Sequence, residues 1–310
     1  MRVLVTGGTG YLGAAIVREL ALRGHQPVVF ARQASSAGLP GVPIDGDVRH
    51  RGALARAAQE VDAIIHTAAL VSIWREQPRE FDDVNVGGLL NVLDVARAKG
   101  IGRVVYTSTF LALPPNGSSA PIEGNDYQRT KRRARVEAVR ALDAGSPLVI
   151  LYPGVVYGPG GATEGNLVGR LLRDHRAGRL PGIVGAGRLW SFAYVDDVAA
   201  AHVQAIERRE AHGEYLLGGE NAPQMRLFEV ARTLVGTPLP RRIPLAAARV
   251  AGAIDELRAR VSGRIPLITR ATVKIFSHDW SMDSSRSIRE LGYRVTLLET
   301  GLVSTLNSLR

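Results

Sequence analysis

Cysteine is absent from this chain, which excludes a disulfide framework and a thiol nucleophile. Also absent is any apolar run long enough to cross a bilayer. The chain opens directly into Arg2-Val3-Leu4-Val5-Thr6, a pattern that predicts a strand rather than a signal peptide. We therefore expect a cytoplasmic protein without a membrane partner, and nothing in the sequence predicts a metal site.

Lysine is scarce, because only three of the 39 basic residues are lysine and the others are arginine. The formal net charge of +10 raises the question of a nucleic-acid partner. The densest basic stretch, Arg129–Arg140, spreads its charges around a helix and contains no aromatic residue. We therefore expect a solvated basic surface that attracts an anionic cofactor, and no nucleic-acid partner.

The first half alternates apolar runs rich in β-branched residues with helical patterns, which predicts an α/β fold with a doubly wound parallel sheet. The apolar runs are nearly continuous, as expected of strands buried on both faces. Strands are expected at Val3–Val5, Val28–Phe30, Ala63–His66, Val104–Tyr106 and Leu148–Leu151. Helices are expected near Leu12–Arg23, Leu54–Gln59, Glu80–Lys99 and Asp126–Leu142.

The pattern changes after Pro153, where Gly and Pro cluster and the strand–helix alternation ends. We predict a dinucleotide-binding domain over residues 1–155 and a smaller C-terminal substrate-binding lobe over residues 156–310, with a soft boundary and some crossing of the chain. One strand is expected at Glu214–Leu217. Helices are expected near Leu167–His175, Asp197–Arg208, Leu227–Leu234, Leu245–Val261 and Leu297–Leu309.

A glycine-rich turn follows the first predicted strand and opens the first predicted helix, with glycines at positions 7, 10 and 13. Glycine permits the tight turn and the close approach of a pyrophosphate, and the helix N-terminus supplies amides to the phosphates. The context therefore predicts dinucleotide binding rather than a plain strand–turn–helix. The expected cofactor contacts here are Thr6, Gly7, Gly10, Tyr11, Leu12 and Gly13.

The end of the second strand indicates which dinucleotide is bound. An acidic residue there would accept hydrogen bonds from a ribose, whereas arginine would pair with a 2′-phosphate. The sequence has Arg32, followed by Ser35 and Ser36, with no carboxylate beside them. We expect NADP(H), with NAD(H) as the alternative if Arg32 is one more surface arginine.

Two further strand ends carry candidate cofactor contacts, because ligands of such sheets bind at the carboxyl ends of strands. Asp47 and Val48 follow the third strand, and the small residues Ala68 and Ala69 follow the fourth. Asp47 fits equally well as a helix N-cap.

Tyr127 and Lys131 form a Tyr-x-x-x-Lys pair that lies on one face of a predicted helix. A phenol with its ordinary pKa near 10 transfers protons poorly at neutral pH. We expect the nearby ammonium and a cationic nicotinamide to lower the pKa of Tyr127. With three lysines in the chain, such a pair seldom arises by accident, and the sequence contains no second one.

The strand before this helix ends in Thr107-Ser108-Thr109. One of these hydroxyls, beside Tyr127, would stabilise the oxygen of a substrate carbonyl. A turn-forming role is the alternative for a single hydroxyl at this position.

The glycine turn, the strand-end hydroxyl and the Tyr127/Lys131 pair together resemble the short-chain dehydrogenase/reductase superfamily. The long C-terminal part, Tyr157-Gly158-Pro159 and Tyr194–Ala199 resemble its extended, epimerase/dehydratase branch. The resemblance spans nearly the whole chain and is nearest to dihydroflavonol-4-reductase-like and hopanoid-associated epimerase-like proteins. It implies a Rossmann sheet, a nicotinamide cofactor and catalysis by a tyrosine.

The resemblance also assigns roles to individual residues. It places the catalytic hydroxyl on Thr109, with Ser108 as the alternative, and the proton donor on Tyr127. It implies that Lys131 holds the nicotinamide ribose and that Thr107 lies at the cofactor. The segment against the nicotinamide ring is Pro153 to Val156, with Pro153, Val155 and Val156 as the expected contacts.

Departures from the family pattern narrow the choice among the reactions that the family catalyses. Phe110 and Leu111 stand where sugar dehydratases carry carboxylates, so elimination of water is not expected. Val155 and Ser191 stand where nucleotide-sugar enzymes carry an Asn and a diphosphate-gripping Arg, although Arg188 lies close enough to replace it. A set of apolar residues would line a pocket for a less polar substrate, or belong to the core: Trp74, Phe110, Leu111, Leu113, Trp190 and Phe192.

We therefore predict an NADP(H)-dependent oxidoreductase that reduces a small carbonyl compound. The alternatives are a nucleotide-sugar epimerase with tightly bound NAD, and a regulator that binds a dinucleotide without catalysis. Family members often form homodimers through the helix bearing Tyr127 and the preceding one. Phe81, Val84, Leu89 and Val92 are candidates for that face, or for ordinary core.

Overall fold

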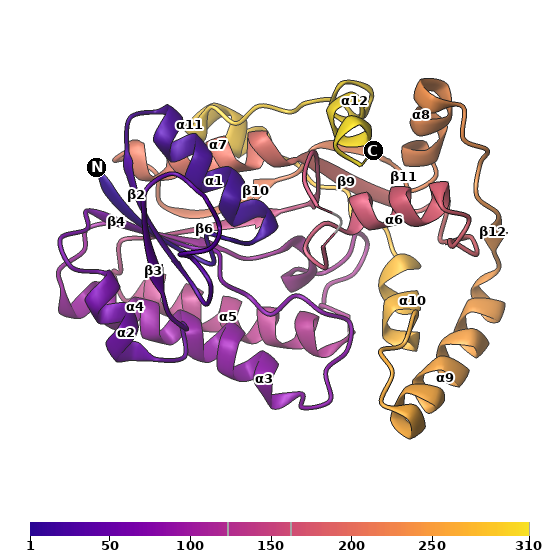
Figure 1. Ribbon diagram of the computed structural model, residues 1–310, viewed down its shortest axis with the longest axis horizontal. Coiled ribbons are helices and arrows are strands. Elements are labelled where there is room, and N and C mark those ends of the chain that lie inside the picture. The colour runs from indigo at the N-terminus through magenta and orange to yellow at the C-terminus, as the bar shows by residue number, and fades with distance from the viewer. Residues whose placement is uncertain (123, 162, 310) are drawn as a thin grey trace.

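The computed structural model describes residues 1–122, 124–161 and 163–309, which form two lobes (Figure 1). Seven strands make up the central sheet, every neighbouring pair is parallel, and the order is β10-β6-β5-β4-β1-β2-β3. The α/β class and the doubly wound parallel sheet are therefore confirmed. The strands are β1 (Arg2–Thr6), β2 (Gln26–Ala31), β3 (Val42–Asp45), β4 (Ala63–His66), β5 (Val104–Thr107), β6 (Leu148–Pro153) and β10 (Gly213–Leu217).

Both faces of this sheet are buried, which explains the continuous apolar runs. In β1, Val3 and Val5 belong to one core cluster and Leu4 to the other. On the first face lie α1 (Tyr11–Leu22), α7 (Val195–Glu207) and α11 (Ser285–Leu291). On the second face lie α2 (Arg51–Ala57), α4 (Gly88–Ala98) and α5 (Asp126–Asp143).

The long helical pattern predicted near Glu80–Lys99 is interrupted. It contains α3 (Arg79–Asp82), the π-helix η1 (Asp83–Gly87) and then α4. A π-helical turn inside an α-helix is rare and often occurs near functional sites. This turn carries the buried side chain of Asn85, whose contacts are described below.

The chain returns to the first lobe after residue 155. Strand β10 pairs with β6 at the edge of the central sheet, and α7 packs on α1. Residues 195–217 therefore complete the first lobe, although they follow part of the second lobe in sequence.

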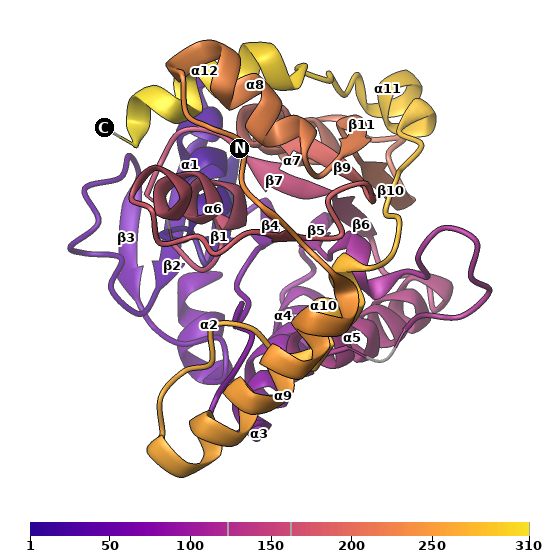
Figure 2. The ribbon, with the colours of Figure 1, turned by 90° about the vertical axis from the view of Figure 1, so that its right-hand side faces the viewer.

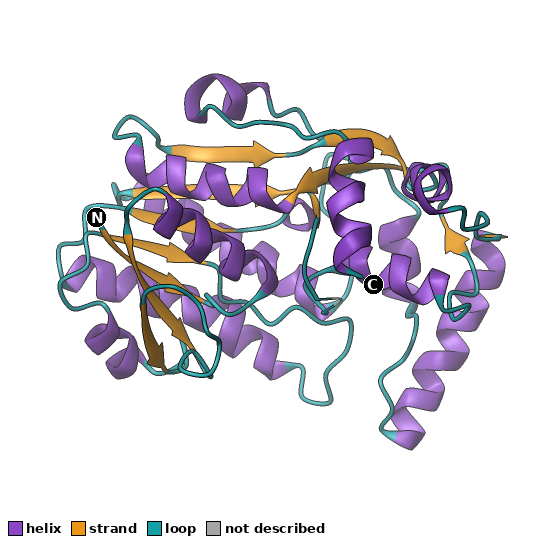
Figure 3. Cartoon of the chain, turned by 45° about the horizontal axis from the view of Figure 1, so that its top comes forward, coloured by secondary structure: helices purple, strands orange, loops and turns teal. Residues whose placement is uncertain are grey.

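The second lobe contains a three-stranded sheet in the order β11-β9-β7 and a two-stranded sheet of β8 and β12. The carboxyl ends of the central strands point toward this lobe (Figure 3). Its strands are β7 (Val155–Tyr157), β8 (Ile183–Val184), β9 (Leu189–Tyr194), β11 (Glu220–Pro223) and β12 (Arg242–Ile243). Its helices are α6 (Leu167–Arg176), α8 (Arg226–Val235), α9 (Leu245–Ser262), α10 (Arg270–Phe276) and α12 (Leu298–Ser308).

The predicted helices of this lobe are confirmed to within two residues at each end. Its small strands and α10 are not predicted by the sequence, because they are short and flanked by Gly and Pro. Within the described ranges, no helix is both long and apolar enough to span a bilayer.

Candidate active site

The glycine turn between β1 and α1 packs directly against the end of β4. Gly7 has φ +70° and, with a Cβ, would place that atom 2.7 Å from the Cα atom of Ala68. A Cβ on Gly13 would collide with the carbonyl oxygen of Gly7. Small residues are therefore required here by packing, and the turn stays close to the strand edge.

The start of α1 offers backbone donors. The first amides of a helix have no partner within the helix, and the N-cap Gly10 provides no side chain to accept from them. The first turn, which the structure describes in full, contains no acidic residue. The amides and the positive end of the helix dipole therefore suit the pyrophosphate of a dinucleotide.

The neighbours of this turn have different surroundings. The Thr6 hydroxyl points inward and lies 2.7 Å from Nδ1 of buried His66. Tyr11 packs on the second lobe, where a Cβ on Gly160 would lie 3.1 Å from its ring. Leu12 packs against the core beneath α1. The cofactor contacts expected of these three side chains stay predictions.

At the end of β2, Arg32 is exposed and has no ion pair within the described part of the chain. The sequence shows no carboxylate beside it, but the fold brings one close. Ser35 donates from its backbone N–H and its hydroxyl to Asp45, at 2.9 and 2.6 Å. The Ser35 donors are therefore occupied by Asp45, which the parallel pairing of β2 with β3 places next to Ala31.

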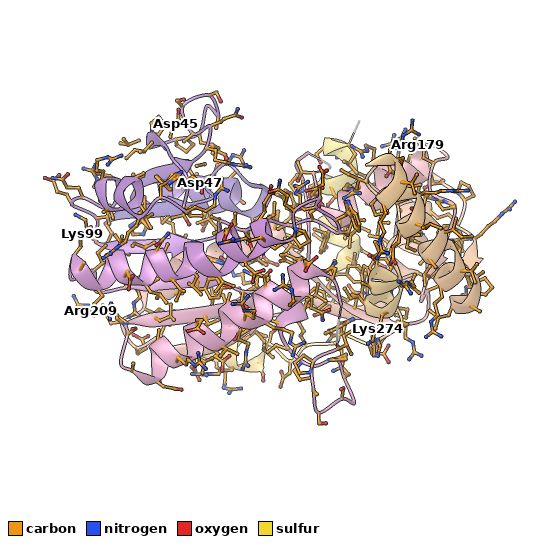
Figure 4. All side chains as sticks on the ribbon, turned by 90° about the horizontal axis from the view of Figure 1, so that it is seen from below. Asp45, Asp47, Lys99, Arg179, Arg209 and Lys274 are labelled. Atoms are coloured by element: carbon orange, nitrogen blue, oxygen red, sulfur yellow. The ribbon has the colours of Figure 1, made fainter. Side chains whose placement is uncertain are left out.

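Asp47 lies near Asp45 at the same part of the first lobe (Figure 4). Its carboxylate pairs with Arg49 at 2.7 Å, and the hydrogen bonds from Arg49 lower the pKa of Asp47. The N-cap of α2 is His50, without a side-chain cap bond, so the N-cap alternative for Asp47 is wrong. The Val48 side chain is 6% exposed and packs on Gly88 in the core.

Helix α5 positions the predicted proton donor. The side chain of Asn125 caps this helix by accepting from the Gln128 amide at 2.9 Å, which places Tyr127 in the first turn. The Thr109 hydroxyl lies beside the Tyr127 phenol. Thr109 also accepts from the Leu111 amide at 3.3 Å, so its own O–H proton is free to be donated.

Ser108 points elsewhere. Its hydroxyl is buried and lies against the Tyr106 phenol, beneath the sheet edge. The structure therefore brings Thr109, and not Ser108, next to Tyr127.

The electrostatics differ from the sequence-based expectation. Burial raises the pKa of Tyr127 to about 12, and the neighbouring Thr109 hydroxyl offsets part of this rise. The expected lowering of the Tyr127 pKa by Lys131 is wrong for the protein without its cofactor, because burial, which disfavours the phenolate, is the dominant influence. Lys131 is itself 2% exposed, and burial lowers its pKa to about 7.

The Lys131 ammonium donates to the Thr107 carbonyl at 2.7 Å and lies 4.7 Å from the centre of the Tyr106 ring. The Thr107 hydroxyl lies 2.8 Å from Nε2 of His202, whose Nδ1 lies 2.7 Å from the Val198 carbonyl. Because a carbonyl only accepts, Nδ1 carries the proton and Nε2 accepts from Thr107. His202 on α7 therefore fixes the strand residue that holds Lys131.

Asn85 provides a second support. Its Nδ2 donates to the Thr130 hydroxyl at 2.9 Å, and its Oδ1 accepts from the Leu70 amide at 2.8 Å. Thr130 lies between Tyr127 and Lys131 on α5, and Leu70 follows Ala68 and Ala69. Neither Asn85 nor His202 is predicted as a site residue from the sequence, where each is one of several polar residues in a helical stretch.

Pro153 ends β6 of the central sheet, and Val155 and Val156 follow in β7 of the second lobe, beside β9. Trp190 and Phe192 are 3% and 0% exposed and belong to the core. Phe110 is half-buried, and the centre of its ring lies 5.3 Å from that of Trp280. Phe110 and Leu111 follow Thr109 in the sequence and are partly buried against the core of the second lobe.

The residues that replace the nucleotide-sugar contacts are engaged elsewhere. Ser191 is buried and its hydroxyl accepts from the Gly219 amide at 3.0 Å. Arg188 pairs with Asp279 at 3.3 Å. The candidate dimer residues Phe81, Leu89 and Val92 are buried in the core, so the homodimer stays a prediction.

Comparison with protein families matches residues 3–218 to the NAD dependent epimerase/dehydratase family. Sterol demethylase protein B of Methylococcus capsulatus is 35% identical over 94% of this chain and 93% of its own length. A putative dihydroflavonol 4-reductase of Synechocystis is 30% identical over 98% and 93%, respectively. The 2-alkyl-3-oxoalkanoate reductase of Stenotrophomonas maltophilia is 32% identical over 94% of each chain.

Among solved structures, UDP-glucose 4-epimerase of Thermus thermophilus in complex with NAD has a TM-score of 0.74 at 25% identity. The match covers 100% of this chain and 99% of that chain. The fold therefore accounts for the whole chain, and the resemblance to dihydroflavonol-reductase-like proteins is confirmed by the second relative.

Proposed function

Because this chain belongs to the NAD-dependent epimerase/dehydratase family and is an NAD(P)-dependent oxidoreductase of the extended short-chain type, we propose that it reduces the carbonyl group of a small, weakly polar compound with NADPH. Two of the three relatives described above are named as reductases, one of them of a 2-alkyl-3-oxoalkanoate.

The observation that carries the proposal is the pairing of Thr109 with Tyr127 at the edge of the parallel sheet. Both are polar groups next to the half-buried apolar residues Phe110 and Leu111. A carbonyl oxygen between the two hydroxyls would meet two donors, while an apolar remainder would rest on Phe110 and Leu111.

When bound, a nicotinamide cofactor would supply the hydride for the carbonyl carbon. Tyr127 gives its phenolic proton to the carbonyl oxygen, which becomes the hydroxyl of the product. Thr109 donates a hydrogen bond to the same oxygen as negative charge develops on it. The charged form of Lys131 stabilises the resulting Tyr127 phenolate, and its remaining N–H donors suit the nicotinamide ribose.

The cofactor part of the proposal rests on Arg32. This exposed guanidinium at the end of β2 has no ion pair with the described residues, so it is available to a 2′-phosphate. We expect Arg32→Gln to raise KM for NADPH at least about tenfold and to leave KM for NADH nearly unchanged. Arg209→Gln, which removes an exposed arginine elsewhere on the first lobe, is the control and should leave both KM values unchanged. A wild-type preference for NADH would reject NADPH as the cofactor.

The reaction is tested with a panel of aldehydes, ketones, 3-oxo acids and nucleotide sugars. Reduction is followed by NADPH absorbance, and conversion of nucleotide sugars by chromatography of the products, because epimerisation consumes no NADPH. The proposal expects turnover of an apolar carbonyl compound and none of a nucleotide sugar. Turnover confined to nucleotide sugars would overturn it.

Nucleotide-sugar epimerisation is the second candidate, because the epimerase structure matches the whole chain. Against it, Ser191 is buried and Arg188 already pairs with Asp279, so a diphosphate would have to compete with that carboxylate for Arg188. NAD that co-purifies with the protein, together with binding of a UDP-sugar, would favour the epimerase.

A further inference from the structure

Helices α9 and α10 form a hairpin at the outer edge of the second lobe, with α9 outermost (Figures 1 and 2). The side of α9 that packs on α10 carries the small buried residues Ala248, Gly252 and Ala259. The acidic residues of α9 are engaged within the hairpin. Asp255 accepts from the Leu267 and Ile268 amides at 2.6 and 3.2 Å, and Glu256 pairs with Arg270 at 2.9 Å.

The opposite side of α9 is apolar and exposed. Val250, Ile254, Leu257 and Val261 are 62%, 46%, 64% and 83% exposed. Their spacing of four, three and four residues places them in one stripe, about 180° around the helix from the buried alanines. Beyond the helix end, Ile265 and Leu267 are 57% and 90% exposed and extend the apolar surface to the tip of the hairpin.

Arginines border this stripe on both sides. By helical geometry Arg249 and Arg260 lie along one flank and Arg258 along the other. All three are exposed and have no ion pair within the described part of the chain. The outer face of α9 thus combines an apolar centre with positive flanks, and its carboxylates are turned toward the hairpin.

We propose that this outer face of α9 binds an anionic lipid surface, with the helix lying in the membrane interface and the apolar stripe buried among the acyl chains. A helix with an apolar face and arginines on its flanks is suited to lie in the interface of an anionic bilayer rather than to span it. Arginine flanks complement anionic headgroups. This goes beyond the sequence-based expectation of no membrane partner, which rests on the absence of a spanning segment.

A second copy of the chain fits this face less well. The four-three-four spacing suits helix pairing, but pairing two such faces would bring arginine flanks against arginine flanks, since both carboxylates of α9 are engaged within the hairpin.

The test is flotation of the full-length protein with phosphatidylcholine vesicles, with and without phosphatidylglycerol. We expect binding only to the phosphatidylglycerol vesicles, and a decrease with added salt. Ile254→Glu/Leu257→Glu should abolish binding. Arg258→Gln should weaken it about fivefold. All three side chains are exposed, so the thermal midpoint and NADPH binding should stay at wild-type values.

Matched controls lie on the first lobe. Leu22 is 82% exposed on α1, and Arg209 is an exposed arginine distant from the hairpin (Figure 4). Leu22→Glu and Arg209→Gln should bind vesicles like the wild type. Absence of wild-type binding, or equal binding by Ile254→Glu/Leu257→Glu, would overturn the proposal. The proposal would also be overturned if the wild-type protein does not bind vesicles but forms a dimer in sedimentation, and if Ile254→Glu/Leu257→Glu is a monomer.

Discussion

The ammonium nitrogen of Lys131 lies 2.7 Å from the carbonyl oxygen of Thr107, where β5 ends. This hydrogen bond joins the helix that carries Tyr127 to the edge of the central sheet. The Thr107 hydroxyl is held in turn by His202. The side chain of Lys131 is therefore held by a backbone carbonyl even without a cofactor. This position buries the ammonium away from water, which is unfavourable for its charged form.

The first prediction concerns this buried ammonium. Burial lowers the pKa of Lys131 to about 7, below its ordinary value, so the unfolded chain binds more protons than the folded one between about pH 7 and pH 10. Lys131 therefore makes stability rise with pH across that window, by up to about 1.4 kcal/mol per pH unit, and its destabilising effect is fully present below pH 7. Lys131→Met should remove this rise.

The measurement is the free energy of unfolding by urea at several pH values for the wild type and Lys131→Met. Lys99→Met, which removes an exposed ammonium (Figure 4), should keep the wild-type pH dependence. Identical slopes for the wild type and Lys131→Met would contradict the burial argument.

The second prediction distinguishes the two neighbouring hydroxyls. Thr109→Val keeps the shape of the side chain but removes the donor beside Tyr127, so kcat should fall about a hundredfold. Ser108→Ala should change kcat less than about threefold, because its hydroxyl faces Tyr106 and a small truncation there disturbs the site little. A greater loss of kcat for Ser108→Ala than for Thr109→Val would reassign the catalytic hydroxyl.

The third prediction concerns the glycine turn. A Cβ on Gly13 would collide with the Gly7 carbonyl, so Gly13→Ala must push the start of α1 away from the turn. NADPH should bind at least about tenfold more weakly, a loss of about 1.4 kcal/mol. Titration of the intrinsic NADPH fluorescence measures this affinity.

The matched control is Gly52→Ala in α2, where the added Cβ meets only Arg56 at 3.8 Å. This change should leave the affinity unaltered and raise stability by about 0.5–1 kcal/mol, because alanine favours the helix. Equal NADPH affinity for Gly13→Ala and Gly52→Ala would mean that the turn does not hold the cofactor.

Much of the first lobe follows from the sequence, because strands buried on both faces leave continuous apolar runs such as Val3–Val5 and Ala63–His66. The strands β7 and β9 could not be predicted from the sequence, because they are short, belong to a small three-stranded sheet and are flanked by Gly and Pro. The interruption at η1 was also beyond prediction, because Asn85 looks like one polar residue in a helix until its partners Leu70 and Thr130 are known.

The site shows the same division. Thr109, Tyr127 and Lys131 lie within 23 residues of one another, so the sequence alone identifies them as a group. In the fold, the hydroxyls of Thr109 and Tyr127 lie side by side. The direction of the Tyr127 pKa depends on burial by distant elements, so the sequence predicted a lowering where the protein alone has a rise. Similarly, Asp45 reaches Ser35 only through pairing of β2 with β3.

The most direct test of the central claim is single-turnover reduction of a carbonyl substrate by Tyr127→Phe with NADPH already bound. The change removes the proton donor and keeps the ring, so the rate should fall at least about a thousandfold, while Kd for NADPH stays at the wild-type value. Tyr215→Phe, which removes a phenol bonded to Glu290 at the far side of the sheet, should keep the wild-type rate. A Tyr127→Phe rate within about tenfold of wild type would contradict the assignment of Tyr127 as the acid.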